Sequence, residues 1–124
     1  MKKTLLILGV ILLAVTAQAK DYSLSTPNST IILSANEGEP LMFCYYGSRA
    51  DVRDVRAAGR MLNYEAYPAY GVRCERPFAS LVKQADGDNA VKFVVEKVVE
   101  SKENSLNRLT FHLRDVAQDR KSVV

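Results

Sequence analysis

The sequence predicts an all-β protein, an antiparallel β-sandwich with one short helical segment in a long loop. Short runs of apolar and β-branched residues recur along the chain, and several of them alternate with polar residues. Residues typical of turns separate these runs, and short strands joined by turns favour a sandwich. Residues 20–118 are enough for one domain with a single core, and they contain no internal repeat.

The first 19 residues have the composition of a signal peptide. Lys2 and Lys3 precede an apolar run over residues 5–15 that is too short to span a bilayer comfortably. Ala17-Gln18-Ala19 then has the small-x-small pattern that a signal peptidase cleaves. We expect cleavage after Ala19 and export to the periplasm or the extracellular space, with no membrane attachment afterwards. An uncleaved anchor is the alternative.

Three strands are expected first, over residues 22–26, 30–35 and 41–46. Pro27-Asn28 forms the first turn, and residues 36–40 form the second. Strict alternation in the third strand puts Leu41, Phe43 and Tyr45 on one face and Met42, Cys44 and Tyr46 on the other. Both faces are apolar, which predicts a strand covered on each side.

The long loop lies between Gly47 and Pro77. Residues 51–60 have helical composition, and Gly59 is the expected terminator. A loop of this length in a compact domain is usually functional or packs against another part of the protein. We expect packing.

Three tyrosines follow the helical segment and cluster around Pro68 and Gly71: Tyr64, Tyr67 and Tyr70. Aromatic faces can stack on sugar rings, so these residues are the candidate carbohydrate contacts. A packed loop is the simpler explanation of the same cluster.

Strands are also expected over residues 78–84 and 91–100, with a turn at residues 86–89 between them. In the second of these strands, one predicted face carries Val91, Phe93 and Val95, and the other carries Lys92, Val94, Glu96 and Val98. A further strand alternates Leu109, Phe111 and Leu113 with Thr110, His112 and Arg114.

Residues 119–124, Asp-Arg-Lys-Ser-Val-Val, are expected to be an artefact of sequencing. The codons GAT CGG AAG AGC GTC GTG encode them, and that string resembles a common adapter oligonucleotide in which the next codon is a stop. We therefore leave this segment out of the predicted fold and treat the domain over residues 20–118 as incomplete. A genuine polar tail is the alternative.

Charge gives no sign of a nucleic-acid partner. The chain has 17 Lys+Arg and 14 Asp+Glu, and removing Lys2, Lys3, Arg120, Lys121 and Asp119 leaves 13 of each over residues 20–118. A nucleic-acid site needs a clustered basic face. The one candidate cluster, Arg49, Arg53, Arg56 and Arg60, is interleaved with Asp51 and Asp54 and is expected to be a solvated surface.

No catalytic residue, metal site or cofactor is expected in this sequence. His112 is the only histidine, whereas zinc needs three or four protein ligands. Residues 86–89 carry too few acids for calcium, which takes six to eight oxygen ligands.

Cys44 and Cys74 are the only cysteines, so an exported form can make one disulfide. Cys44 lies in an apolar strand, where a free buried thiol behaves as a small hydrophobe. A bridge and two free thiols remain equal alternatives.

Several blocks, in order, resemble the amino-terminal β-domain of family 36 glycoside hydrolases, the bacterial α-galactosidases. The blocks are Ser25–Ile31, Leu41–Gly47, Tyr67–Gly71, Arg76–Ala79 with Asp86-Gly87, and Phe111–Asp115. Ile31 stands where the family has an aromatic residue, and Arg76 replaces an acid. The order and spacing of the blocks carry the resemblance, which spans residues 22–118.

The resemblance implies a retaining α-galactosidase built from a β-supersandwich, a (β/α)8 barrel and a small carboxy-terminal β-domain. The family's two catalytic aspartates lie on barrel strands, at the end of the barrel where such active sites form. The acids of this chain, Asp51, Asp54, Glu65, Asp86 and Asp88, therefore inherit no catalytic role. The chain would be a partial supersandwich that meets α-galactosides through the full-length enzyme, which can be a homo-oligomer. The alternative is a stand-alone carbohydrate-binding or surface sandwich.

Overall fold

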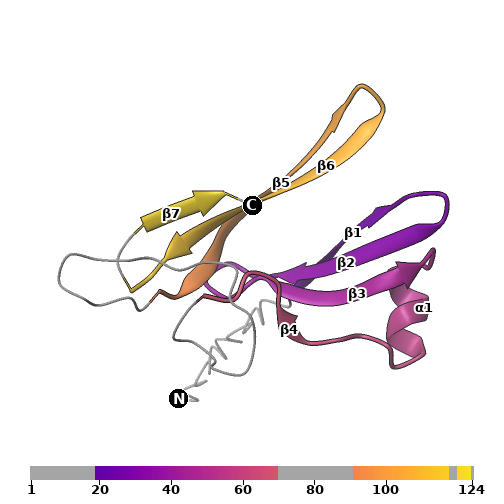
Figure 1. Ribbon diagram of the computed structural model, residues 1–124, viewed down its shortest axis with the longest axis horizontal. Coiled ribbons are helices and arrows are strands. Elements are labelled where there is room, and N and C mark those ends of the chain that lie inside the picture. Colours follow the sequence, from indigo (N-terminus) through magenta and orange to yellow (C-terminus); the bar gives the residue numbers. More distant parts are fainter. Residues whose placement is uncertain (1–18, 70–90, 118–119, 124) are drawn as a thin grey trace, which may run out of the picture.

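The computed structural model describes residues 19–69, 91–117 and 120–123, which form two antiparallel sheets and one short helix (Figure 1). The first sheet has the order β1-β2-β3-β4, with β1 at Lys20–Ser25, β2 at Ser29–Ala35, β3 at Met42–Ser48 and β4 at Tyr64–Glu65. The second sheet has the order β5-β6-β7, with β5 at Phe93–Glu103, β6 at Leu106–Asp115 and β7 at Arg120–Val123. The prediction of an all-β, sandwich-like fold is confirmed.

Side-chain and backbone hydrogen bonds close the predicted turn between β1 and β2. Thr26 Oγ1 accepts from the N–H groups of Asn28, at 3.3 Å, and Ser29, at 3.0 Å. The N–H of Thr26 in turn donates to the carbonyl of Ser29 at 2.8 Å. The threonine hydroxyl thus satisfies two backbone N–H groups that have no partner strand in the turn. This stabilises the turn at these residues.

The alternation predicted for β3 is wrong because the strand contains a β-bulge. Cys44 is the extra residue between the two regular stretches of pairing with β2. Met42 and Tyr45 consequently share one face and pack toward the helix, while Phe43 and Tyr46 share the other face. Tyr46 is 69% exposed, so the prediction that both faces are covered is also wrong at this residue.

The predicted helix is present as α1, Val52–Ala57. Asp51 is its N-cap and accepts from the N–H of Arg53 at 2.9 Å. Gly59 has φ +64 and follows the C-cap; the bonds from Gly59 N to Arg56 O and from Arg60 N to Val55 O, both 3.1 Å, complete a Schellman motif. The role predicted for Gly59 is confirmed.

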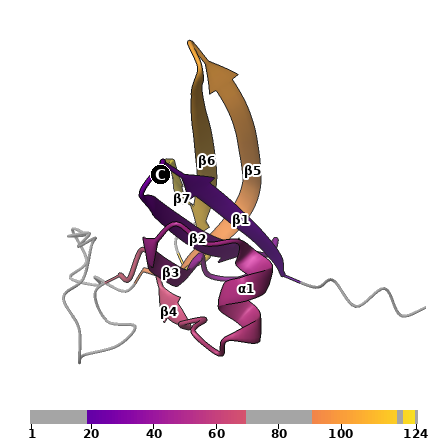
Figure 2. The same ribbon diagram turned by 90° about the vertical axis from the view of Figure 1, so that its right-hand side faces the viewer.

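The hairpin of β5 and β6 extends beyond the predicted strands. Its turn is the pair Asn104-Ser105, with φ 47 and φ 68, flanked by the pair Glu103 and Leu106. Positive φ at both residues is typical of a two-residue hairpin turn. Asparagine is common at such positions, but serine is not, so this turn is only weakly indicated by the sequence. Figures 1 and 2 show the distal part of this hairpin projecting away from β1, β2 and β3.

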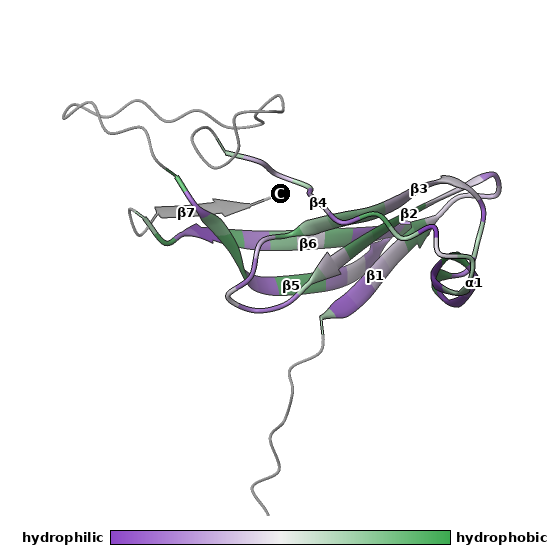
Figure 3. Cartoon of the chain, turned by 90° about the horizontal axis from the view of Figure 1, so that it is seen from below, coloured by the Kyte–Doolittle hydropathy of each residue, from purple (hydrophilic) through white to green (hydrophobic). Residues whose placement is uncertain are grey.

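The alternation predicted for β5 is wrong beyond Val95, again because of a bulge. Glu96 is the extra residue in the pairing with β6. Val98 therefore joins Val95 on the inner face and packs on the same cluster as Phe111, instead of sharing a face with Val94. Figure 3 shows bands of apolar and polar residues along β5 and β6.

The main core lies between the two sheets. Its buried members are Ala35, Leu41, Val95, Phe111 and Leu113, and its half-buried neighbours include Tyr22, Leu33, Tyr67 and Phe93. A backbone link joins the sheets at this core, because Val95 N donates to Glu39 O at 2.8 Å and Val95 O accepts from Gly38 N at 2.9 Å.

A second core lies between the first sheet and α1, so this sheet is covered on both faces over part of its area. Ile32, Cys44 and Val55 are buried there. Arg56 of α1 forms an ion pair with Asp21 of β1 across the same boundary. The helical part of the long loop therefore packs against the first sheet, in agreement with the expectation that this loop packs against another part of the protein.

Some predicted elements lie outside the described residues, namely the strand over residues 78–84 and the turn over residues 86–89. Residues 120–123, which the sequence suggested leaving out, pair with residues 112–115 of β6. Among the described residues, no helix is long and apolar enough to cross a membrane.

Candidate functional site

The sandwich is open at the hairpin ends of its sheets, where an open groove of about 530 Å³ lies between them. Its first wall comes from the end of the β1–β2 hairpin and from β3, and its second wall from the tip of the β5–β6 hairpin. The lining residues are Leu24, Ser25, Thr26, Pro27, Ser29, Ile31, Tyr46, Ser105, Leu106 and Asn107. We call this feature the hairpin groove.

A row of apolar residues forms the floor of the hairpin groove. Leu24 pairs with Ile31, and Ile31 pairs with Tyr46, so the three side chains stand in line across β1, β2 and β3 on one face. Tyr22, two residues before Leu24, lies on the same face and packs in the core between the sheets. The groove floor is thus a continuation of the core surface.

This apolar surface is open to solvent. Tyr46 is 69% exposed and Leu106, on the facing hairpin tip, is 72% exposed. Contiguous exposed apolar surface next to a core marks a site of protein interaction more often than a random surface does. The lining residues carry hydroxyl groups, one side-chain amide and the Tyr46 phenol. Among these described residues there is no carboxylate, amine, guanidinium or imidazole. The groove therefore offers apolar surface and hydrogen-bonding groups for binding.

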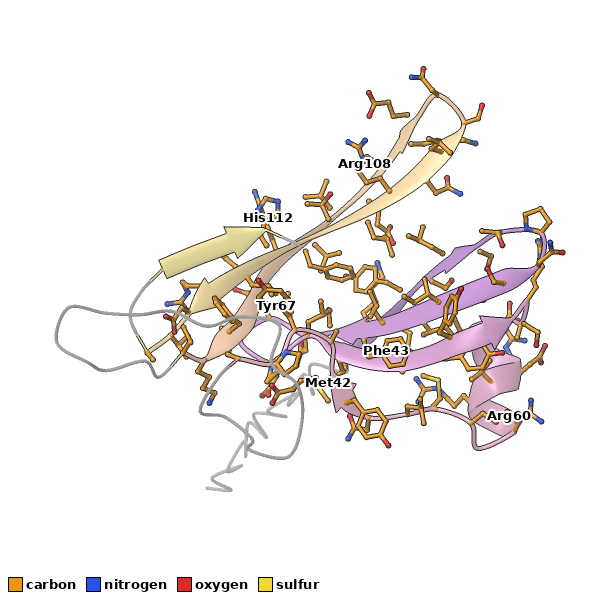
Figure 4. The ribbon with its side chains drawn as sticks, in the orientation of Figure 1. Met42, Phe43, Arg60, Tyr67, Arg108 and His112 are labelled. Carbon is orange, nitrogen blue, oxygen red and sulfur yellow. The ribbon has the colours of Figure 1, made fainter. Side chains whose placement is uncertain are left out.

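The tyrosines predicted as sugar contacts occupy different environments. Tyr67 is half-buried, and its ring lies 5.4 Å from that of Phe93 at an interplanar angle of 61°. Figure 4 shows Tyr67 close to the base of β5. Tyr64 is 38% exposed and pairs with Phe43 at the edge of the first sheet. Tyr70 lies outside the described residues, so the full cluster stays a prediction.

Cys44 is buried, and no disulfide joins it to any described residue. Burial raises the pKa of its thiol, and the nearby Asp21 carboxylate raises it further, because both disfavour the thiolate. Cys74 lies outside the described residues, so a Cys44–Cys74 bridge and two free thiols both stay as alternatives.

The other residues considered in the sequence analysis lie at ordinary positions in or beside strands and the helix. Ala19 is exposed and directly precedes β1, so the expected cleavage point adjoins the first strand. His112 is half-buried on β6, opposite Lys97. Asp51 caps α1, and Asp54 lies in the first turn of that helix. Over the described residues, no group of three or more His, Cys, Asp or Glu side chains could hold a metal ion.

Sequence reasoning missed two buried polar residues that anchor neighbouring segments. Thr30 is 1% exposed, and its Oγ1 accepts from the N–H of Ala50 at 3.2 Å, which ties β2 to the start of the helical segment. Asp115 is fully buried, and its Oδ1 accepts from the N–H groups of Lys92 and Ala117, both at 3.0 Å. Neither residue has a local pattern that marks it as buried, because its partners are distant in sequence or belong to a loop.

Comparison of the sequence with protein-family models and with curated proteins found no match.

Proposed function

We propose that this chain is the non-catalytic amino-terminal β-domain of an exported α-galactosidase. In this proposal the hydrolysis of terminal α-galactosyl residues belongs to a barrel encoded downstream. The hairpin groove is the observation that carries the proposal. Its apolar floor continues the core surface and is open to solvent, so another domain of the enzyme would be expected to pack on it. A domain that packs against the rest of an enzyme needs such a surface.

Three of the five blocks that resemble the family lie fully within the described residues and have definite structural roles, which supports the proposal. Ser25–Ile31 forms the first hairpin turn and part of the groove floor, and Leu41–Gly47 contains most of β3, including its bulge. Phe111–Asp115 ends β6 with the buried residues Phe111, Leu113 and Asp115.

Gly47, which ends the second block, packs closely against the Tyr45 ring. A Cβ atom at Gly47 would lie 2.7 Å from Tyr45 Oη and 3.0 Å from its Cζ. The Tyr45 ring therefore lies over the Gly47 backbone, and its hydroxyl donates to the Ser48 carbonyl at 2.9 Å. The Tyr-Tyr-Gly sequence thus has a physical reason within this fold.

The stand-alone sugar-binding alternative has less support. Tyr67, the central residue of the predicted stacking cluster, is engaged with Phe93 between the sheets. A ring packed in that way presents little face to a sugar.

Long-read sequencing of the source locus through codon 118 tests the proposal first. We expect the frame to continue past Gln118 into alternating strands and helices with two suitably placed aspartates. A genuine stop codon after Val124 would contradict the enzyme proposal.

The full-length product then provides a functional test. We expect it to hydrolyse a chromogenic α-galactoside, and we expect the mature chain over residues 20–118 to be inactive. The matched control is the full-length protein with both barrel aspartates changed to asparagine. Sequencing of the exported product should find Lys20 at its amino terminus, since cleavage is expected after Ala19.

Calorimetry with melibiose separates the two functions. We expect no binding to the isolated mature chain. Saturable binding that Tyr64→Ala abolishes would favour the stand-alone sugar-binding module instead.

A further inference from the structure

Within the described part of the chain, backbone hydrogen bonds reach the outer edge of β5 only at its beginning. Val95 exchanges backbone hydrogen bonds with Gly38 and Glu39. Past this residue, no backbone bond from any described segment reaches the outer edge of residues 98–103. Unpaired strand edges of this kind are templates for pairing with another strand.

The hairpin geometry determines which backbone groups face this edge. The two-residue turn makes Glu103 and Leu106 a directly facing pair, so the N–H and C=O of Glu103 point toward β6. Because this direction alternates along an antiparallel strand, those of Glu100 and Lys102 point outward to the free edge. Each of these two residues is exposed.

The distal hairpin also lacks cover on its faces. Residues 99–108 are exposed on both strands, and Figure 4 shows Arg108 on this projecting part. Val99 is 40% exposed. A two-stranded ribbon without further support is only marginally stable in water. Pairing at the β5 edge would convert it to a four-stranded antiparallel sheet.

We propose that two copies of this chain associate by antiparallel pairing of their β5 edges about a two-fold axis at Ser101. In this register Glu100 of one copy lies opposite Lys102 of the other, and the symmetry repeats the ion pair. The same two residues supply outward-facing N–H and C=O groups, so charge and hydrogen bonding favour the same arrangement.

Neighbouring registers are disfavoured by charge or by the bulge. An axis at Glu100 places that residue opposite its own copy, and an axis at Lys102 does the same for the lysine. An axis at Val99 would bring Lys102 opposite Glu96, which is the extra residue of the bulge and lies outside the regular ladder. The axis at Ser101 is therefore selected.

Charge exchange tests this pairing in the mature chain that starts at Lys20. We expect sedimentation equilibrium at low salt to show a concentration-dependent dimer. Glu100→Lys and Lys102→Glu should each raise the dissociation constant roughly ten-fold, because each puts two like-charge pairs at the interface. The double variant Glu100→Lys/Lys102→Glu should restore the original constant. Lys97→Glu is the matched control and should change it less than two-fold, since Lys97 lies outside the proposed ladder.

A crosslink tests the axis directly. Ser101 and its symmetry mate form a non-hydrogen-bonded pair with Cα atoms about 4.5 Å apart, within disulfide range. In a Cys74→Ser background, Ser101→Cys should give an oxidised dimer, whereas Leu106→Cys at the exposed hairpin tip should not crosslink at comparable concentration.

The proposal is overturned by a wild-type chain that stays monomeric over the accessible concentrations, or by a double variant that fails to recover association. Equal crosslinking of Ser101→Cys and Leu106→Cys would also overturn it, since that result indicates non-specific aggregation. Circular dichroism of each variant establishes that the charge changes leave the fold intact. These outcomes are independent of the α-galactosidase proposal, which depends on the downstream sequence and on hydrolysis.

Discussion

Tyr22 of β1 and Phe111 of β6 meet edge to face between the two sheets, with ring centroids 5.7 Å apart and an interplanar angle of 88°. This arrangement directs the positive edge of one ring toward the negative face of the other. The pair joins strands that are far apart in sequence, and it lies beside the buried residues Val95 and Leu113. The pair therefore bridges the two sheets by an aromatic contact.

A double-mutant cycle should detect this contact. We expect Phe111→Ala to lower the free energy of unfolding by about 3–5 kcal/mol, because it removes a buried ring from the core. In a cycle of Tyr22→Leu and Phe111→Leu, the coupling energy should be about 0.5–1.5 kcal/mol. Denaturant unfolding at one fixed protein concentration measures these values, since association would change the apparent stability. Strict additivity of the two substitutions would contradict the contact.

Gly47→Ala should destabilise the fold by about 1 kcal/mol, because the new methyl group would displace the Tyr45 ring and break the hydrogen bond from its hydroxyl to the Ser48 carbonyl. In a Tyr45→Ala background the same substitution should be neutral or slightly stabilising, since there is then no ring to displace and alanine reduces the entropy of the unfolded chain. Urea unfolding of the four proteins gives both values. An equal cost in the two backgrounds would show that Tyr45 is not the cause.

The Cys44 thiol should react slowly in the native protein. Its burial and its raised pKa both limit the thiolate that a disulfide reagent can reach. In a Cys74→Ser variant, which isolates Cys44, we expect reaction with an aromatic disulfide reagent at neutral pH to be roughly 100-fold slower than after unfolding in urea. Equal rates before and after unfolding would contradict the buried position.

The same thiol should make stability fall at alkaline pH. The folded pKa lies above the unfolded one, so the unfolded state loses its proton first as the pH rises. The stabilising contribution is complete below the ordinary thiol pKa and is lost as the pH rises through that value toward the folded pKa. At alkaline pH, the free energy of unfolding should therefore fall less steeply with pH in the Cys44→Ala/Cys74→Ser variant than in the Cys74→Ser variant. Identical slopes would rule out this linkage.

Asp115 should be a major anchor of the second sheet. Asp115→Ala leaves the N–H groups of Lys92 and Ala117 without their carboxylate partner, and we expect a loss of about 2–4 kcal/mol in unfolding free energy. Asp115→Asn keeps a carbonyl oxygen that can accept from both groups, so its cost should be less than half as large. Chemical denaturation distinguishes the two variants. Similar losses in both would indicate that the charge, and not the acceptor geometry, is decisive.

Local chemistry made part of this structure predictable. The helix was identified from composition and from Gly59, and the structure supplies the reason, since Asp51 and Gly59 satisfy backbone groups at its two ends. The first hairpin was likewise predictable from Pro27-Asn28, because turn residues act through their own backbone and near neighbours. The buried row in β6, with Phe111 and Leu113, followed from simple alternation.

The hairpin groove could not be predicted in the same way. Tyr46 and Leu106 are apolar residues in strands, and sequence alone assigns such residues to a core. Their exposure depends on how far the β5–β6 hairpin diverges from the first sheet, which is a property of the two sheets together.

The sequence by itself determined the all-β class, the short helix with its terminator Gly59, and the turn between the first two strands. Tertiary structure alone decided which face each residue occupies beyond the bulges at Cys44 and Glu96. The physical reason is that strand alternation has a period of two, so one extra residue inverts every later side chain. Whether a strand takes up that extra residue depends on the packing of both partner strands, and those partners meet only in the folded chain.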